Sequence, residues 1–86
     1  MARYAVEFKP SARRELEKLS DRLIARLLPK IESLAANPRP SGCRKLQGYT
    51  DLWRIRVGNY RVVYIINDTC KNLSITRIAH RRDVYE

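Results

Sequence analysis

The alternation of apolar and polar residues predicts a β-hairpin over residues 51–66. Arg54 and Arg56 fall on one face of its first strand, and the opposite face is apolar. The residues of that apolar face are Trp53, Ile55 and Val57. The dipeptide Gly58-Asn59 follows, and glycine at its first position suits a type II′ turn, whose twist matches that of the strands. Because one face of this hairpin carries guanidinium groups, it is suited to bind an anion.

A helical periodicity replaces the alternation over residues 10–36. Ser11 follows a proline that fits a first helical turn, and its hydroxyl is expected to cap free amides there. A second helix, over about residues 21–36, follows Ser20, which can serve as its N-cap, and carries a wide apolar stripe. Because almost nothing separates the two helices, we expect them to pack as an antiparallel hairpin.

Extended segments lie on both sides of this helical pair. Residues 3–8 alternate between polar and apolar side chains, which predicts a half-buried strand. Residues 44–46 are expected to form a short strand or an extended approach to the hairpin, and residues 72–79 are expected to form the last strand. The order of strand, helix, helix and further strands is typical of an α+β layer. We therefore expect an N-terminal strand and an antiparallel helical hairpin packed on a three- to four-stranded, mostly antiparallel sheet. The other sheet face should be partly open.

The composition limits the class of protein. The 86 residues allow one small domain, expected to span residues 1–86. No apolar run approaches the roughly 18 residues that span a bilayer, and the N-terminus lacks the apolar stretch of a signal peptide, so we expect a cytoplasmic protein without a membrane partner. Cys43 and Cys70 are expected to be reduced, and nothing gives ground for assigning a metal or a cofactor. The net charge of +9 favours polyanionic partners, namely nucleic acid, an acidic protein or an anionic membrane surface.

The side chains present favour one kind of reaction. The chain has no phosphate-binding glycine loop, no Ser-His-Asp or Cys-His arrangement and no acid cluster suited to magnesium. RNA supplies its own nucleophile in the 2′-hydroxyl, so a transesterification needs only groups that bend the backbone in line, neutralise the phosphorane and move protons. Arginines and tyrosines can do most of this without a metal. Tyr60, Tyr64 and Tyr85 are also candidates to stack on an unpaired base, although the pattern favours a core or sheet position for each of them.

Several motifs of the chain are similar to those of one protein family. They are the Gly-x-Tyr-Arg-Val-Val-Tyr core within residues 52–64, the ending His-Arg-x-x-x-Tyr at residues 80–85, the helix start Pro-Ser-Ala-x-x-x-Leu-x-x-Leu, and Lys-Leu-x-Gly at residues 45–48. Together they resemble the RelE branch of the RelE/ParE toxin superfamily of bacterial and archaeal toxin–antitoxin systems. The resemblance covers essentially the whole chain. It implies a small ribonuclease-like fold whose members enter the ribosomal A site and cleave mRNA there.

The resemblance also implies a set of site residues. In that family, basic residues and a C-terminal tyrosine surround the scissile phosphate, and they correspond here to Arg54, Arg56, Arg61, Arg81 and Tyr85. By this analogy Arg61 and Arg81 would bind and neutralise the phosphate. Arg54 and Arg56 would position and stabilise it, and Tyr85 would stack on or orient the attacked nucleotide.

The general base is a separate question, because the best-known member of the family has lysines at the positions of Arg54 and Arg56. Arginine, with a pKa above about 12, cannot act as a base, whereas a buried lysine can. His80, with an ordinary pKa of about 6.5, is one candidate, and Tyr85 is another. If Arg81 faces the site, however, strand alternation turns His80 away from it. Further RNA contacts are expected from three other basic residues, Arg44, Lys45 and Arg82.

The function implied by the resemblance is that of a toxin that inhibits translation as a ribosome-dependent, metal-independent mRNA endonuclease. Its partners would be the ribosome, mRNA and an acidic, RelB-like antitoxin that silences it, and operator DNA would be reached only through the antitoxin. Two alternatives stay open: a ParE-like inhibitor of DNA gyrase, and a catalytically degenerate toxin that acts as a binding protein. The clustered arginines favour the nuclease, because a gyrase inhibitor has no need of a phosphate site.

Overall fold

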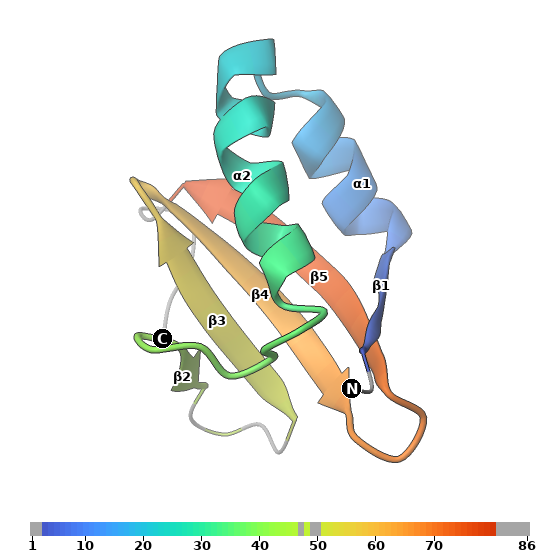
Figure 1. Ribbon diagram of the computed structural model, residues 1–86. Helices are drawn as coiled ribbons and strands as arrows, with labels where there is room; N and C mark the ends of the chain where they lie inside the picture. The colour runs from blue at the N-terminus through green and yellow to red at the C-terminus, as the bar shows by residue number, and fades with distance from the viewer. Residues whose placement is uncertain (1–2, 47, 49–50, 81–86) are drawn as a thin grey trace.

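The computed structural model describes residues 3–46, 48 and 51–80. Its elements are, in chain order, strand β1 (Ala5–Phe8), helices α1 (Pro10–Glu17) and α2 (Asp21–Ser33), and strands β2 (Arg44–Lys45), β3 (Leu52–Val57), β4 (Tyr60–Asn67) and β5 (Asn72–His80). Figure 1 shows α1 and α2 side by side over one face of the sheet. The predicted α+β class is therefore confirmed.

The sheet has five strands in the order β1-β5-β4-β3-β2. Neighbouring strands are antiparallel except for β1, which runs parallel to β5 and places Ala5 opposite Asn72. The sheet is wider than the three or four strands expected because both edge segments join it, the N-terminal strand on one side and the two residues of β2 on the other. The predicted hairpin is confirmed as β3 and β4, which lie inside the sheet between β5 and β2.

The two helices begin in different ways. α1 begins at Pro10, and the Ser11 hydroxyl does not cap it but donates a hydrogen bond of 3.1 Å to the Thr76 carbonyl in β5. The expected capping role of Ser11 was therefore wrong, because the hydroxyl satisfies a neighbouring strand instead. The predicted N-cap of α2 is confirmed, since the Ser20 hydroxyl accepts a hydrogen bond from the Leu23 amide. Neither helix in the described part of the chain is long and apolar enough to cross a membrane.

The main core lies between the helices and the sheet. Alternate residues of the three central strands face the helices and are buried there, together with the apolar stripe of α2. The buried residues of this core are Ala12, Leu27, Ile31, Leu34, Ile55, Val62, Tyr64, Ile66, Leu73, Ile75 and Ile78. The face that the alternation predicted to be apolar is thus the face that packs on the helices.

A second, smaller cluster lies on the opposite face of the sheet. It consists of buried Leu46, Val63 and Ala79, with partly buried Leu52 beside them. Because no helix covers this face, the cluster closes only its middle. The arginines of the hairpin lie on this face, beside the cluster.

We predict that Leu27→Ala lowers the free energy of unfolding by about 2 to 5 kcal/mol, because Leu27 is 1% exposed and the substitution leaves a cavity under α2. Urea denaturation followed by circular dichroism measures the change. Arg22→Ala, at an exposed position of the same helix, is the matched control and should change the value by less than about 0.5 kcal/mol. Equal effects of the two substitutions would contradict the assignment of Leu27 to the core.

Candidate functional site

The turn between β3 and β4 fixes the register of the central hairpin. The backbone φ is +60° at Gly58 and is not positive at Asn59, which fits the predicted type II′ turn. A side chain at residue 58 would be strained at this φ, and its Cβ would lie 3.2 Å from the guanidinium of Arg26. Because the contacting atoms are the end of the exposed Arg26 side chain, which can shift, the positive φ is what favours glycine here. The resulting register places Arg56 directly opposite Arg61.

Arg56 and Arg61 form a pair of cations on the sheet face that lies away from the helices. Arg56 is exposed and Arg61 is half-buried. On its other side Arg61 is opposite Ala79 of β5, whose small side chain takes little space on this face. Two guanidinium groups on one sheet face can donate hydrogen bonds to the same anion. The pair is suited to bind a phosphate or a carboxylate.

Arg54 shares this face, as the alternation predicted, but it does not lie on the open surface. Its side chain is only 2% exposed, and its Nη1 donates a hydrogen bond of 3.3 Å to the carbonyl oxygen of Gly42. Arg54 is also directly opposite Arg44 of β2. The structure thus brings Arg54 beside the arginine pair as a buried group that holds the loop before β2, and it leaves Arg44 exposed.

The loop before β2 is also attached to the sheet at its far end. The hydroxyl of Tyr64, which is fully buried, donates a hydrogen bond of 2.7 Å to the Pro38 carbonyl. Arg39 forms an ion pair with Asp68, with Nη2 and Oδ2 2.9 Å apart. The guanidinium of Arg39 also lies over the ring of Trp53, 4.9 Å from its centroid. These contacts fix the position of the loop and therefore of β2.

Asp68 provides the charge that holds this attachment. Its carboxylate accepts hydrogen bonds from Arg39 and from the Tyr4 hydroxyl, the latter at 2.6 Å, and these bonds lower its pKa to about 2. The same bond to Asp68 raises the pKa of Arg39. Burial raises the pKa of Tyr64. At neutral pH the loop is therefore held by an ion pair and a neutral phenol.

The structure does not bring His80 to the arginine pair. His80 is opposite Tyr60 in the register of β4 and β5, and their rings meet edge to face with centroids 5.4 Å apart. Arg61 follows Tyr60 in the same strand, so the Arg61 side chain points to the opposite face of the sheet from Tyr60 and His80. Tyr64 lies on the same side as Tyr60 and is fully buried. Tyr60 and Tyr64 therefore do not stack on a base beside the arginines, and their preferred assignment to the core or the sheet is confirmed.

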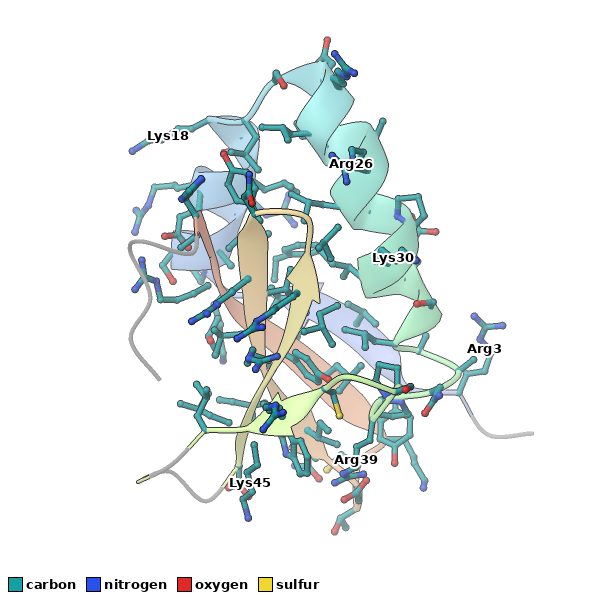
Figure 2. The ribbon with its side chains drawn as sticks, turned by 90° about the vertical axis from the view of Figure 1, so that its left-hand side faces the viewer. Arg3, Lys18, Arg26, Lys30, Arg39 and Lys45 are labelled. Carbon is teal, nitrogen blue, oxygen red and sulfur yellow. The ribbon has the colours of Figure 1, made fainter. Side chains whose placement is uncertain are left out.

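The other predicted RNA-binding residues differ in their placement. Lys45 follows Arg44 in a two-residue strand, so the two side chains point to opposite faces. Figure 2 shows Lys45 extending away from the sheet at the β2 edge. Three further predicted site residues lie outside the described residues, namely Arg81, Arg82 and Tyr85.

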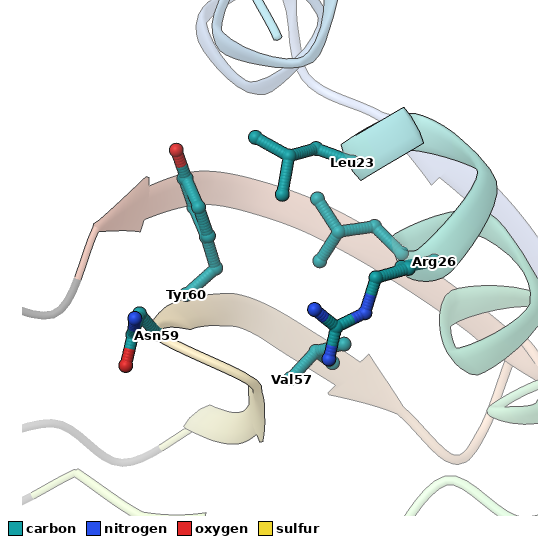
Figure 3. Close-up of a pocket in the computed structure, with 6 residues that line it drawn as sticks. Leu23, Arg26, Val57, Asn59 and Tyr60 are labelled. Atoms are coloured by element: carbon teal, nitrogen blue, oxygen red, sulfur yellow. The ribbon is translucent and has the colours of Figure 1, made fainter. Parts of the chain in front are cut away.

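A small groove of about 70 Å³ lies between α2 and the hairpin turn. Its lining residues are Leu23, Arg26, Leu27, Val57, Asn59 and Tyr60. In Figure 3, Arg26 extends from α2 toward the turn, and Leu23 and Tyr60 lie across the groove from each other. A groove with apolar walls and a guanidinium at its side suits a peptide segment that carries an apolar residue near an acidic one.

Potential metal ligands do not gather in the described part of the chain. No three His, Cys, Asp or Glu side chains within residues 3–46, 48 and 51–80 are arranged so that they could hold a metal ion. Cys43 is half-buried and Cys70 is exposed, and both are free thiols.

Comparisons of the sequence with known proteins all match toxins. A family model described as the ParE toxin of the type II toxin–antitoxin system parDE matches residues 6–85. Toxin RelG of Mycobacterium tuberculosis is 32% identical over 83 residues, which cover 95% of each chain. The similarity therefore extends over nearly all of both sequences.

Several solved structures share the fold. The RelBE toxin–antitoxin complex of Mycobacterium tuberculosis contains a chain with a TM-score of 0.82 and 32% identity, covering 94% of both chains. The archaeal RelE–RelB complex of Pyrococcus horikoshii gives a TM-score of 0.80 at 29% identity and covers 94% of this chain and 98% of that one. The intact RelBE complex of Escherichia coli gives a TM-score of 0.79 at 25% identity and covers 90% of this chain and 95% of that one. The whole fold, and not a single motif, is shared.

We predict that Asp68→Asn makes the stability of the fold less sensitive to acid. Because the pKa of Asp68 is lowered to about 2 in the folded protein, the carboxylate stabilises the fold fully above its unfolded pKa of about 3.9 and loses this effect as the pH falls through about 2. The melting temperature of the wild type should therefore fall more steeply between about pH 4 and pH 2 than that of the variant.

Thermal denaturation followed by circular dichroism measures both curves. The side chains of Arg39 and Asp68 are 42% and 54% exposed, so about 1 M salt should reduce the difference between them. Parallel curves at low salt would show that the Arg39–Asp68 pair does not contribute to stability.

Proposed function

The chain belongs to the RelE/ParE family of toxins of type II toxin–antitoxin systems, and we propose that it acts as a ribosome-dependent mRNA endonuclease. It would cut mRNA in the ribosomal A site through attack of a 2′-hydroxyl on the adjacent phosphate, without a metal. The observation that carries this proposal is the register that holds Arg56 opposite Arg61 on the sheet face away from the helices. Relatives named RelG and RelE support the nuclease branch of the family.

The two arginines suit the change in charge during this reaction. Attack of the 2′-oxygen adds negative charge to the phosphate oxygens as the phosphorane forms, and fixed guanidinium groups stabilise that charge without reorganising. Their planar forks also hold two phosphate oxygens at once, which favours an in-line geometry. Because arginine stays protonated, we assign Arg56 and Arg61 to charge stabilisation and positioning, and not to proton transfer.

Proton transfer requires a different group. His80 contacts Tyr60 on the other side of the sheet. We therefore assign the role of general base to Tyr85, with Arg81 as its cationic neighbour at the phosphate. The chemistry of the phenol supports this assignment, because a cationic neighbour such as Arg81 favours its deprotonated form. Both residues lie outside the described residues.

The family model, which is named for ParE, supports a second candidate function. A ParE-like protein would inhibit DNA gyrase with the same fold and without cutting RNA, and fold alone does not distinguish the two. In that case the arginine pair would be a binding surface for an acidic patch of protein. The two functions differ in whether mRNA is cleaved when ribosomes are present.

We infer that a RelB-type antitoxin silences this toxin. The similar structures from Mycobacterium tuberculosis and Pyrococcus horikoshii are complexes with antitoxins. The net charge of +9 attracts an acidic segment, and the groove beside Arg26 in Figure 3 suits an apolar residue near an acidic one. Operator DNA would be reached through the antitoxin, and the site of action would be the cytoplasm, where ribosomes translate mRNA.

We predict that Arg56→Ala and Arg61→Ala each lower the rate of A-site cleavage by about 100-fold or more, because each removes one cation from the phosphate. Primer extension on a defined mRNA in a reconstituted translation reaction measures the cuts. Lys18→Ala, which removes an exposed charge at the end of α1, is the control and should cleave at the wild-type rate. Naked mRNA without ribosomes should stay intact.

Two outcomes would reject parts of this assignment. If the wild type stops growth but leaves mRNA intact, the nuclease is rejected and a gyrase cleavage assay becomes the next experiment. If either arginine variant loses its helical and sheet signal in circular dichroism, the arginine is needed for the fold and its role in cleavage is not shown by the loss of activity.

We also predict that the toxin associates with its antitoxin quickly at low salt and more slowly as salt rises, because the charges steer the encounter. Stopped-flow fluorescence at several salt concentrations measures the association rate. Toxin and co-expressed antitoxin that elute separately from a sizing column at low salt would contradict the partnership.

A further inference from the structure

A second basic site lies beside the arginine pair, where β2 meets β3. It is an open groove of about 350 Å³. Its lining residues are Ser41, Gly42, Arg44, Arg54, Ile55 and Arg56. Arg56 belongs to this groove and also faces Arg61 across the hairpin. The groove is therefore continuous with the site proposed for the scissile phosphate.

The register of the strands orders the cations of this groove. Arg44 is directly opposite Arg54, and Arg54 and Arg56 are two residues apart on one face of β3. The cations thus step from Arg61 on β4 to Arg56 and Arg54 on β3 and then to Arg44 on β2. Neighbouring strands lie about 4.8 Å apart, so these positions form a short row across the sheet.

The groove is held in place by a buried side chain. Arg54 is 2% exposed and donates a hydrogen bond to the Gly42 carbonyl, which attaches the loop to β3. Arg44 comes two residues after Gly42 and is exposed. The bond therefore positions the backbone from which the Arg44 side chain extends. In this arrangement Arg54 is a positioning residue, and Arg44 is the residue that contacts a ligand.

We propose that this groove binds a second phosphate of the RNA chain, one that neighbours the scissile phosphate, with Arg44 as its main contact. This inference rests on the proposed function. A row of cations over three adjacent strands matches a polymer that carries an anion at every repeat, and a guanidinium binds a phosphate in a two-pronged geometry. The Ser41 hydroxyl at the groove supplies a further donor for a phosphate oxygen. Binding there would fix the direction of the strand through the site.

The test measures binding and does not depend on cleavage. Ribosomes are programmed with an mRNA that lacks the attacked 2′-hydroxyl, so that it stays intact in the A site, and fluorescently labelled toxin is titrated onto them. In a matched series of mRNAs, one linkage at a time is replaced by an uncharged methylphosphonate, at the scissile position and at each neighbouring position. The proteins compared are the wild type, Arg44→Ala and the control Lys18→Ala.

We expect one neighbouring methylphosphonate to weaken binding of the wild type about tenfold, the size of one charge-assisted contact. Arg44→Ala should weaken binding to the unmodified mRNA by a similar factor. It should cause no further loss on the mRNA with that neutral linkage, because the two changes remove the same contact. Lys18→Ala should match the wild type on every mRNA.

Other outcomes would overturn the inference in distinguishable ways. If the loss of affinity caused by Arg44→Ala multiplies with the loss caused by each neighbouring methylphosphonate, Arg44 does not contact those phosphates. In that case, weaker binding to the mRNA with the scissile methylphosphonate would still support the proposed nuclease. If no methylphosphonate affects binding, the proposed function fails as well. If Arg44→Ala weakens binding to the antitoxin and not to the programmed ribosome, the groove binds a carboxylate of the partner protein.

Discussion

The arrangement of the site depends on the register of one hairpin. A slip of one residue between β3 and β4 would move every side chain of the slipped strand to the other face, so that arginines would enter the core and apolar residues would face solvent. The Gly58 turn and the apolar contacts of the opposite face both select the observed register. The burial of apolar side chains against the helices therefore also sets Arg56 opposite Arg61. The same alternation therefore determines both the packing of the core and the position of the arginine pair.

A second constraint is the attachment of the loop that precedes β2. This loop has little regular structure, and its position is set by contacts with distant parts of the chain, through Arg39 to Asp68 and through Tyr64 to the Pro38 carbonyl. Arg54 attaches the other end of the loop, at Gly42. A strand of two residues such as β2 would be only marginally stable by itself, so these contacts hold β2 in its position at the sheet edge. The basic groove is thus built by long-range contacts.

These two constraints explain which features could be predicted from the sequence. The hairpin, both helices, the Ser20 cap and the shared face of Arg54 and Arg56 follow from local periodicity and turn chemistry, and all were predicted. The burial of Arg54 was not, because nothing local indicates that the loop covers it.

Long-range contacts were beyond the sequence patterns for the same reason. The Arg39–Asp68 pair joins residues that are 29 positions apart, and each residue alone reads as an ordinary surface charge. The parallel pairing of β1 with β5 likewise brings together the first and the last strand of the sheet in chain order. Alternation could place His80 only relative to Arg81, and the pairing of His80 with Tyr60 shows which face of the sheet His80 lies on.

The most direct test of the central claim is the chemical end of the cleaved mRNA. If arginines stabilise attack by the RNA's own 2′-hydroxyl, mass spectrometry of the upstream fragment from a ribosomal cleavage reaction will find a 2′,3′-cyclic phosphate, and the downstream fragment will begin with a 5′-hydroxyl. An upstream fragment that ends in a 3′-hydroxyl would show that water attacks instead, and mRNA that stays intact would show that this protein is not a nuclease. Either result would contradict the role assigned to Arg56 and Arg61.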